Sequence, residues 1–206
     1  TMPAVRNAPA VYETFAPSQL PVSFVIGDSV TFDRRTIRGI ARALGSPFLM
    51  LSVLNFDSSA FGGITADDRA YESRPYADTM GIAVNADFDH YWGQRSKKLR
   101  DNIKRYQARC AKAGIELGFR EAADPEAVAS AFETYATIES AGWKGKQGTA
   151  ISLDNDQGKF YADALVRMAH RGEAKIFELL ADDVVIASRI AVFSGGHGVF
   201  LEATYD

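Results

Sequence analysis

The chain has 206 residues, of which 47% are hydrophobic and 24% charged, and its formal net charge is −3. This balance is typical of a globular protein with one large or two small domains, and no apolar run approaches the roughly 20 residues of a membrane helix. The lone Cys110 and three scattered histidines exclude an internal disulfide and give no metal-ligand spacing. We expect no metal and a cytoplasmic location.

The N-terminal part has the pattern of a parallel crossover unit. Residues 1–21, rich in Pro and Ala, are expected to form an irregular arm, and 22–26 (VSFVI) a short strand. A helix is expected from residue 31 to 44, and the apolar run 48–54 suits a strand buried on both faces. A strand, a helix and a second strand in this order predict a parallel pair.

The segment 55–79 has no sustained periodicity, and a loop of that length is often functional. Residues 80–84 (MGIAV) read as a further strand, after which Asp87 is a plausible helix cap.

The longest helical pattern coincides with the densest positive charge, at residues 91–114. Its apolar stripe, at the spacing of one helix face, is Leu99, Ile103, Tyr106, Cys110 and Ala113. Eight cations, opposed by Asp101 alone, cover the other faces: Arg95, Lys97, Lys98, Arg100, Lys104, Arg105, Arg109 and Lys112. This helix is either a solvated surface element or a contact for an anion such as cofactor phosphates, nucleic acid or acidic carbohydrate. We expect it to join two α/β halves and to pack through its stripe.

The C-terminal part predicts a strand at 115–121 and then two helices. Asp124 and Pro125 begin the first helix, whose inward residues are expected to be Val128, Phe132, Tyr135 and Ile138. After a Gly- and Lys-rich loop at 141–150, Asp154 or Asn155 caps the second helix, which stops near Gly172. An antiparallel meander completes the chain, with turns at 182–183 and 194–198.

Three segments carry a resemblance to a known family: SKKLRDNIKRYQARCAKAG (96–114), IESAGWKGKQGTAI (138–151) and ADDVVIASRIAVFSGGHGVFLEATYD (181–206). They are similar to motifs of the FemAB-like and CelD-like acyltransferases, which are associated with cellulose and exopolysaccharide gene clusters and share the N-acetyltransferase (GNAT) fold. The resemblance implies an α+β, GNAT-like fold: a partial N-terminal half (1–86), the basic connecting helix (87–114) and a C-terminal half (115–206). It also implies a coenzyme A pyrophosphate loop after the strand that ends the chain, so we expect this half to be incomplete and inactive alone.

Acyl transfer needs a proton acceptor and a donor to the developing oxyanion. Glu202 lies in an otherwise apolar strand, on the face of Phe200 and Thr204, where burial would favour a general base; an edge-strand Glu in water is the alternative. Tyr205 could donate to the oxyanion or to the leaving thiolate, or pack in the core.

Binding residues are expected in three places. Trp143 and Lys144 lie in a loop that could close over a ligand, unless the Trp anchors in the core. Arg189 could anchor an anion, although a structural pair with Glu178 or Glu202 is favoured. The candidates on the basic helix are Lys98 and Arg105.

The resemblance implies direct transfer from acetyl-CoA or another acyl-CoA to an amine or hydroxyl acceptor through a ternary complex. It implies a polysaccharide precursor or a related molecule as the acceptor. Two alternatives remain: a FemAB-like transferase that uses aminoacyl-tRNA, and a non-catalytic module that binds a polyanion. No nucleic-acid partner is expected outside the tRNA alternative, and no oligomeric state is indicated.

Overall fold

The computed structural model describes residues 4–8, 10–14, 34–44, 49–55, 74 and 80–205. The chain divides into two compact units, residues 1–83 and 84–206. In the described ranges, no helix is both long enough and apolar enough to cross a membrane.

The first unit contains a three-stranded sheet and one helix. Strands β1 (Ala4–Ala8) and β2 (Val11–Thr14) pair antiparallel, and β3 (Met50–Ser52) pairs parallel to β2. Helix α1 (Arg34–Leu44) lies between β2 and β3 in the sequence, so a parallel strand–helix–strand unit is present. Its first strand is β2, however, and residues 22–26 lie outside the described residues.

Two expectations for the first unit are wrong. Strands β1 and β2 form a β-hairpin rather than part of an irregular arm, and Ala10, just before β2, lies in the left-handed region (φ 64°). The strand at 48–54 is not buried on both faces, because Leu49 and Met50 are 77% and 50% exposed. Of the segment 55–79, only Asn55 and Arg74 are among the described residues.

The second unit begins with two helices where the sequence predicted one. Residues 80–84 form no strand, and α2 (Phe88–Gly93) precedes α3 (Lys97–Lys112). Asp87 caps α2 as expected, its carboxylate accepting a hydrogen bond from the His90 amide at 2.8 Å. Ser96 starts α3 anew, because its hydroxyl accepts from the Leu99 amide at 3.3 Å.

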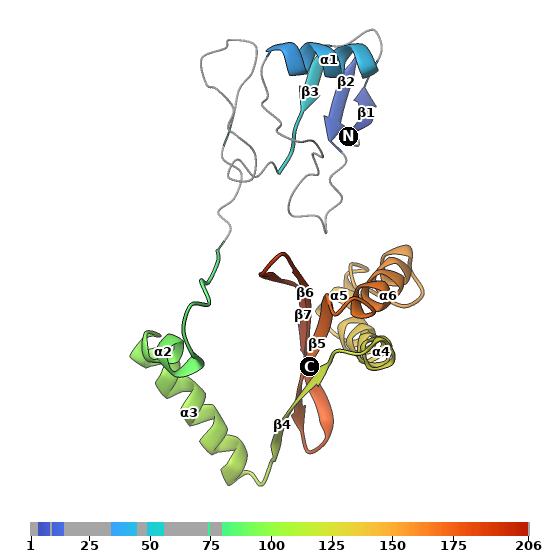
Figure 1. Ribbon diagram of the computed structural model, residues 1–206. Helices are drawn as coiled ribbons and strands as arrows, with labels where there is room; N and C mark the ends of the chain where they lie inside the picture. The colour runs from blue at the N-terminus through green and yellow to red at the C-terminus, as the bar shows by residue number, and fades with distance from the viewer. Residues whose placement is uncertain are drawn as a thin grey trace. The chain divides into compact units, whose positions relative to one another are not determined.

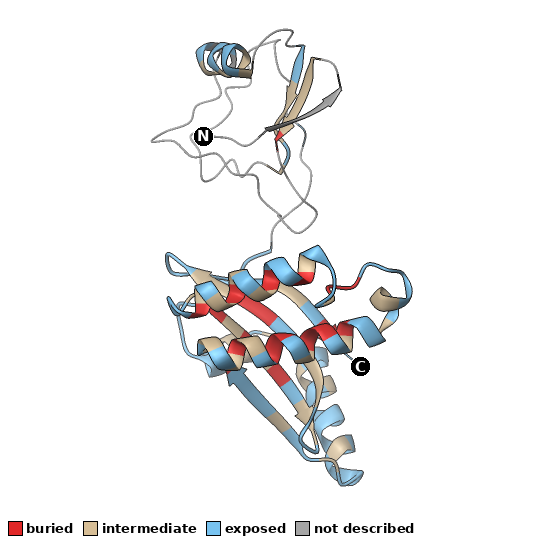
Figure 2. Cartoon of the chain, turned by 90° about the vertical axis from the view of Figure 1, so that its right-hand side faces the viewer, coloured by how far each residue is buried: buried red, intermediate tan, exposed pale blue. Residues whose placement is uncertain are grey.

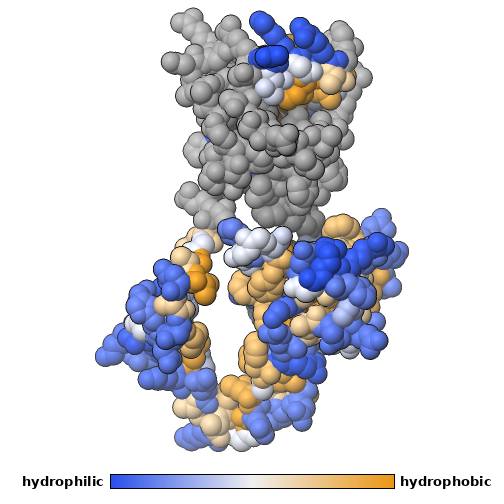
Figure 3. Space-filling view, viewed as in Figure 1, coloured by the Kyte–Doolittle hydropathy of each residue, from blue (hydrophilic) through white to orange (hydrophobic). Residues whose placement is uncertain are grey.

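The apolar stripe of α3 is not buried within residues 84–205, so its predicted packing is wrong. Helix α3 has no buried residue, and Leu99, Ile103 and Tyr106 are 43%, 39% and 50% exposed. Hydrophilic side chains cover its outer side (Figure 3). The cations therefore lie on a solvent-exposed helix.

A pair of isoleucine substitutions measures this difference in packing. Ile190→Ala should lower the free energy of unfolding by about 2–5 kcal/mol, because Ile190 is fully buried in the core. Ile103→Ala should cost less than about 1 kcal/mol, since its side chain already contacts water. Equal losses in urea denaturation would show that α3 packs as tightly as the sheet.

The rest of the second unit is a four-stranded antiparallel sheet with helices on one face. Its order is β4-β5-β6-β7, and the strands are β4 (Leu117–Ala122), β5 (Ala174–Ala181), β6 (Val184–Ser194) and β7 (His197–Tyr205). Helices α4 (Pro125–Ala141) and α6 (Asp156–Ala169) lie side by side, with their buried residues toward the sheet (Figure 2). Between them comes the single turn α5 (Trp143–Lys146).

Local sequence signals explain these helices. The Asp124 carboxylate accepts from the Ala127 amide at 2.9 Å, with Pro125 in the first turn of α4. Of the two predicted caps of α6, Asn155 is the one used, and its side chain accepts from the Gly158 amide at 2.8 Å. The core between helices and sheet contains Val128, Ala131, Phe132, Tyr135, Ile151, Tyr161, Leu165, Ile176 and Ile190.

A β-bulge in β7 changes which side chains share a face. Ile190 lies opposite Glu202, and the next residue, Ala191, lies opposite Phe200, so Leu201 is the extra residue. Glu202 and Thr204 face the helices, whereas the Phe200 ring lies 6.2 Å from that of Phe177. The expectation that Phe200 shares the face of Glu202 is therefore wrong.

Candidate functional site

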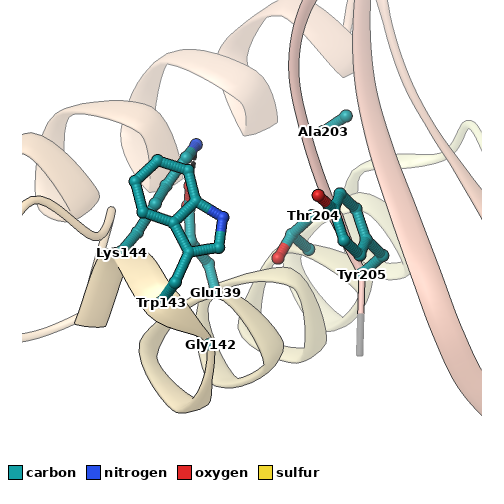
Figure 4. A pocket seen from close by; sticks show the side chains of 7 residues that line it. All are labelled: Glu139, Gly142, Trp143, Lys144, Ala203, Thr204 and Tyr205. Carbon is teal, nitrogen blue, oxygen red and sulfur yellow. Dashed lines mark hydrogen bonds and ion pairs between the residues drawn. The ribbon is translucent and has the colours of Figure 1, made fainter. Parts of the chain in front are cut away.

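A small pocket lies where the C-terminal end of α4, the turn α5 and the last residues of β7 meet. Trp143 faces Thr204 and Tyr205 across it (Figure 4). Its lining consists of Glu139, Gly142, Trp143, Lys144, Ala203, Thr204 and Tyr205.

One lysine joins two carboxylates beside this pocket. The ammonium of Lys144 donates hydrogen bonds to Glu139 Oε1 and, at 3.2 Å, to Glu202 Oε2. The Glu139 side chain is 1% exposed, whereas those of Lys144 and Glu202 are 25% and 26% exposed. The cluster therefore extends from the core to the pocket and joins α4, α5 and β7.

The cluster fixes the protonation state of its lysine. Burial alone would lower the pKa of Lys144, but the hydrogen bonds and charges of Glu139 and Glu202 outweigh burial and hold the pKa above its ordinary value. Lys144 is thus an ammonium that can stabilise negative charge.

Close backbone packing places Lys144. A Cβ built on Gly145 would lie 1.8 Å from the carbonyl oxygen of Ser140, so only glycine lets α5 approach the end of α4 this closely. The Thr149 amide donates to the Lys144 carbonyl at 2.9 Å and closes the turn. Part of the predicted loop at 141–150 is therefore a hydrogen-bonded helical turn.

Two tyrosines complete the surroundings of the cluster. Burial raises the pKa of Tyr135 above its ordinary value, and the carboxylate of Glu139 raises it further. Burial, followed by the charges of Glu202 and Glu139, raises the pKa of Tyr161 to about 12. Both phenols therefore remain neutral around the carboxylates.

The family described as acetyltransferase (GNAT) domain matches residues 97–206, just over half of the chain. The chain belongs to this family. No curated protein matches the chain. GNAT membership supports a transferase with a small-molecule acyl donor and acceptor, for which acetyl-CoA or another acyl-CoA is the typical donor. The pocket lies within the GNAT domain, as do all seven residues that the sequence singled out.

Four of those seven residues come together in the GNAT domain. Glu202 and Lys144 form an ion pair, and Trp143 and Tyr205 line the same pocket as Lys144. Trp143 and Tyr205 are 56% and 68% exposed, so neither is anchored in the core. Their catalytic and binding roles stay predictions.

The other three residues lie away from the pocket lining. The guanidinium of Arg189 lies 4.5 Å from the centre of the Phe200 ring, so the structural pair favoured from the sequence is wrong. Glu178 pairs instead with Arg120, at 2.6 Å. Lys98 and Arg105 are exposed on α3, where Arg105 donates to the Asn102 side chain at 3.1 Å.

Glu139 is the residue of this candidate site that the sequence interpretation missed. The buried stripe of α4 passes through Val128, Phe132 and Tyr135, and a spacing of four residues places Glu139 next on it. Sequence reasoning assigned the inward position to Ile138. A carboxylate that continues an apolar stripe was the available signal, because such a group needs a partner.

A glycine substitution in α5 tests how the candidate site is held. Gly145→Ala should lower the free energy of unfolding by about 1–3 kcal/mol, because the new methyl group meets backbone that must move. Gly142→Ala is the matched control, since its Cβ would meet no atom closer than 3.5 Å. Equal melting temperatures of the two variants in thermal denaturation would contradict this account of α5.

Alkaline pH should weaken the domain through Tyr161. Its pKa is about 12 in the folded protein, against an ordinary value of about 10, so stability is full below about pH 10 and falls toward pH 12. In Tyr161→Phe, the free energy of unfolding measured by urea denaturation should decrease less over this pH range. Tyr106→Phe, on exposed α3, should leave it unchanged. An unaltered slope in Tyr161→Phe would contradict the assignment.

Proposed function

We propose that this GNAT domain transfers an acyl group from acyl-CoA directly to an amine or hydroxyl acceptor bound at the Trp143–Tyr205 pocket. The observation that carries the proposal is the placement of Glu202. Its carboxylate lies on the last strand, partly exposed and 3.2 Å from a lysine that stays protonated, in a domain that matches acetyltransferases.

Five side chains in or beside the pocket have a role in this proposal. Glu202 accepts the proton that the acceptor loses as it attacks the thioester. Lys144 stabilises the negative charge that develops on the thioester oxygen. Tyr205 donates to that oxygen or to the departing thiolate, and Trp143 forms a wall against the bound ligand. Glu139 holds Lys144 in position.

Direct transfer through a ternary complex agrees with the composition of the pocket. None of the residues that line it is a cysteine, a serine or a histidine. The one free thiol, Cys110, lies on α3. A covalent acyl-enzyme would need an activated nucleophile, and the only hydroxyls in the lining are those of Thr204 and Tyr205.

We extend the proposal to the acceptor and to the basic helix. The resemblance of residues 96–114, 138–151 and 181–206 to the FemAB-like and CelD-like acyltransferases favours a precursor of a polysaccharide as acceptor, in the cytoplasm. Lys98, Arg105 and Arg189 are the proposed contacts for phosphates of the donor or for an anionic acceptor.

Release of the coenzyme A thiol tests the proposal. The full-length protein should release thiol from acetyl-CoA only when an acceptor is added from a panel of amines, amino sugars and hydroxylated sugars. The Lys144→Met variant should lose this release, whereas Lys146→Met, an exposed lysine of the same turn, should keep it. Release that is equally fast without acceptor would contradict transfer.

The exposed charge of α3 favours polyanion binding as a second candidate function. The helix carries seven cations and one carboxylate, and none of its residues is buried. Such a surface suits a polyanion, either the tRNA of an aminoacyl-tRNA-dependent transferase or the ligand of a non-catalytic binding module. Saturable binding of tRNA or heparin without any thiol release would favour this second candidate.

A further inference from the structure

The pocket has two aromatic walls that are open to a ligand. Trp143 of α5 and Tyr205 of β7 line it from opposite sides and are 56% and 68% exposed (Figure 4). Among the described residues, no other aromatic ring and no cation is stacked on either of them. Aromatic side chains that line a hollow commonly hold an apolar face of a ligand. Each wall therefore offers a ring to a molecule that enters the pocket.

The backbone holds both walls in place. Trp143 begins α5, which Gly145 lets approach the carbonyl oxygen of Ser140 so closely that no Cβ would fit. Tyr205 lies opposite Ala187 in the paired strands β6 and β7. Walls that are fixed before a ligand arrives lose little entropy when it binds. The fold therefore sets the spacing of the two walls.

Polar groups lie along one edge of the same pocket. Thr204 lies beside Tyr205 on the wall that faces Trp143 (Figure 4). The ammonium of Lys144 and the carboxylate of Glu202 lie 3.2 Å apart at this edge. A ligand that matches this lining has apolar faces and a polar rim. A sugar ring has both, because its axial C–H bonds point to its faces, where the negative face of an aromatic ring attracts them, and its equatorial hydroxyls point outward.

Two aromatic walls restrict the stereochemistry of such a ring. An axial hydroxyl that points at an aromatic wall loses its hydrogen bonds to water and gains none in return. Against a single wall, a sugar with one axial hydroxyl can turn its other face to the protein. Between two walls, neither orientation avoids the contact. A β-pyranose of the gluco configuration has only C–H bonds on both faces, so it fits between two walls.

We propose that the pocket between Trp143 and Tyr205 is a subsite for one pyranose ring of the gluco configuration, whose hydroxyl or amino group beside Glu202 is the acyl acceptor. The role of this sugar as acceptor rests on the proposed function, whereas its binding does not. Trp143 and Tyr205 are then the residues that determine which sugar binds.

Binding of three epimers tests the stereochemistry. The indole N–H signal of Trp143 in NMR spectra of the full-length protein, assigned by its loss in Trp143→Phe, reports on the pocket. Methyl β-D-glucopyranoside should shift this signal saturably. The β-galactoside, with an axial 4-hydroxyl, and the β-mannoside, with an axial 2-hydroxyl, should bind at least about tenfold more weakly, because each leaves one hydroxyl unpaired. Equal affinities for the three sugars would overturn the proposal.

Substitutions test the two walls separately. Trp143→Ala should abolish the transfer of NMR saturation from the protein to the glucoside. Phe160→Ala, which removes a ring of similar exposure (66%) on α6, should leave this transfer unchanged. Tyr205→Ala should no longer distinguish the glucoside from the galactoside, because the axial hydroxyl can then point to water, whereas Tyr205→Phe should keep the distinction. Transfer that survives in Trp143→Ala, or selection that survives in Tyr205→Ala, would overturn the two-wall subsite.

Acyl transfer separates this inference from the proposed function. If the glucoside binds as described but no acceptor leads to release of the coenzyme A thiol, the proposed function fails and the subsite remains. If glucosamine, galactosamine and mannosamine support equal thiol release and none of the three glycosides binds, the subsite is rejected and the proposed function remains.

Discussion

Glu202→Gln in the full-length protein should lower kcat about a hundredfold to ten-thousandfold, the usual contribution of a positioned base. The amide keeps the size of the side chain and a hydrogen-bond acceptor but cannot take the proton of the acceptor. Glu202 is suited to this role because its carboxylate accepts a hydrogen bond from Lys144 at 3.2 Å and its side chain is 26% exposed beside the pocket. The pH–rate profile should also lose the limb that belongs to the base.

The control for this change is Glu121→Gln. Glu121 is a carboxylate of the same sheet that pairs with a lysine, Lys175, at 2.6 Å, far along the sheet in the edge strand β4. It should keep full activity. If Glu202→Gln is also fully active, Glu202 only holds Lys144, and the proton leaves through water.

Lys144→Met should lower the free energy of unfolding by about 3 kcal/mol, because it leaves Glu139 as a buried carboxylate without its cation. The double variant Lys144→Met/Glu139→Gln should recover most of this loss, since removing both partners of a buried pair is often nearly neutral. Urea denaturation of the single and double variants measures the recovery.

Lys146→Met provides the matched control, because Lys146 is an exposed lysine of the same turn. Its stability should match that of the wild type. A double variant as unstable as Lys144→Met would mean that the methionine disturbs packing and that the charge of Glu139 has no part in the loss.

Much of the C-terminal architecture could be predicted from the sequence, because its signals are local. Asp124 with Pro125, Asn155 and Gly172 mark helix ends through backbone capping, and the turn at 182–183 separates two β-rich runs. Each of these features depends on a few neighbouring residues. The antiparallel meander and the two helices of the predicted α+β fold follow from them.

The features that were predicted wrongly depend on partners distant in sequence. The bulge at Leu201, which separates Phe200 from Glu202, appears only when β7 pairs with β6. Amphipathic spacing suggested burial of the α3 stripe, but spacing cannot supply an element to pack against.

Only part of the site could be predicted, because the rest of it also depends on partners distant in sequence. Trp143, Lys144, Glu202 and Tyr205 stood out by type and position, and the structure brings them together. That Glu139 and Glu202 share one lysine could not be read from residues that lie 63 positions apart. The face of Arg189 likewise depended on which strand residues lay opposite it.

Calorimetric titration of the full-length protein with coenzyme A tests the central claim most directly, when compared with a linear polyphosphate of similar charge. An acyl-CoA-dependent transferase should bind coenzyme A saturably at one site, and the polyphosphate should neither reproduce the heat nor compete at equal concentration. Binding of the polyphosphate alone, or equal binding of both that disappears together as salt rises, would contradict the account and leave a polyanion-binding surface on α3.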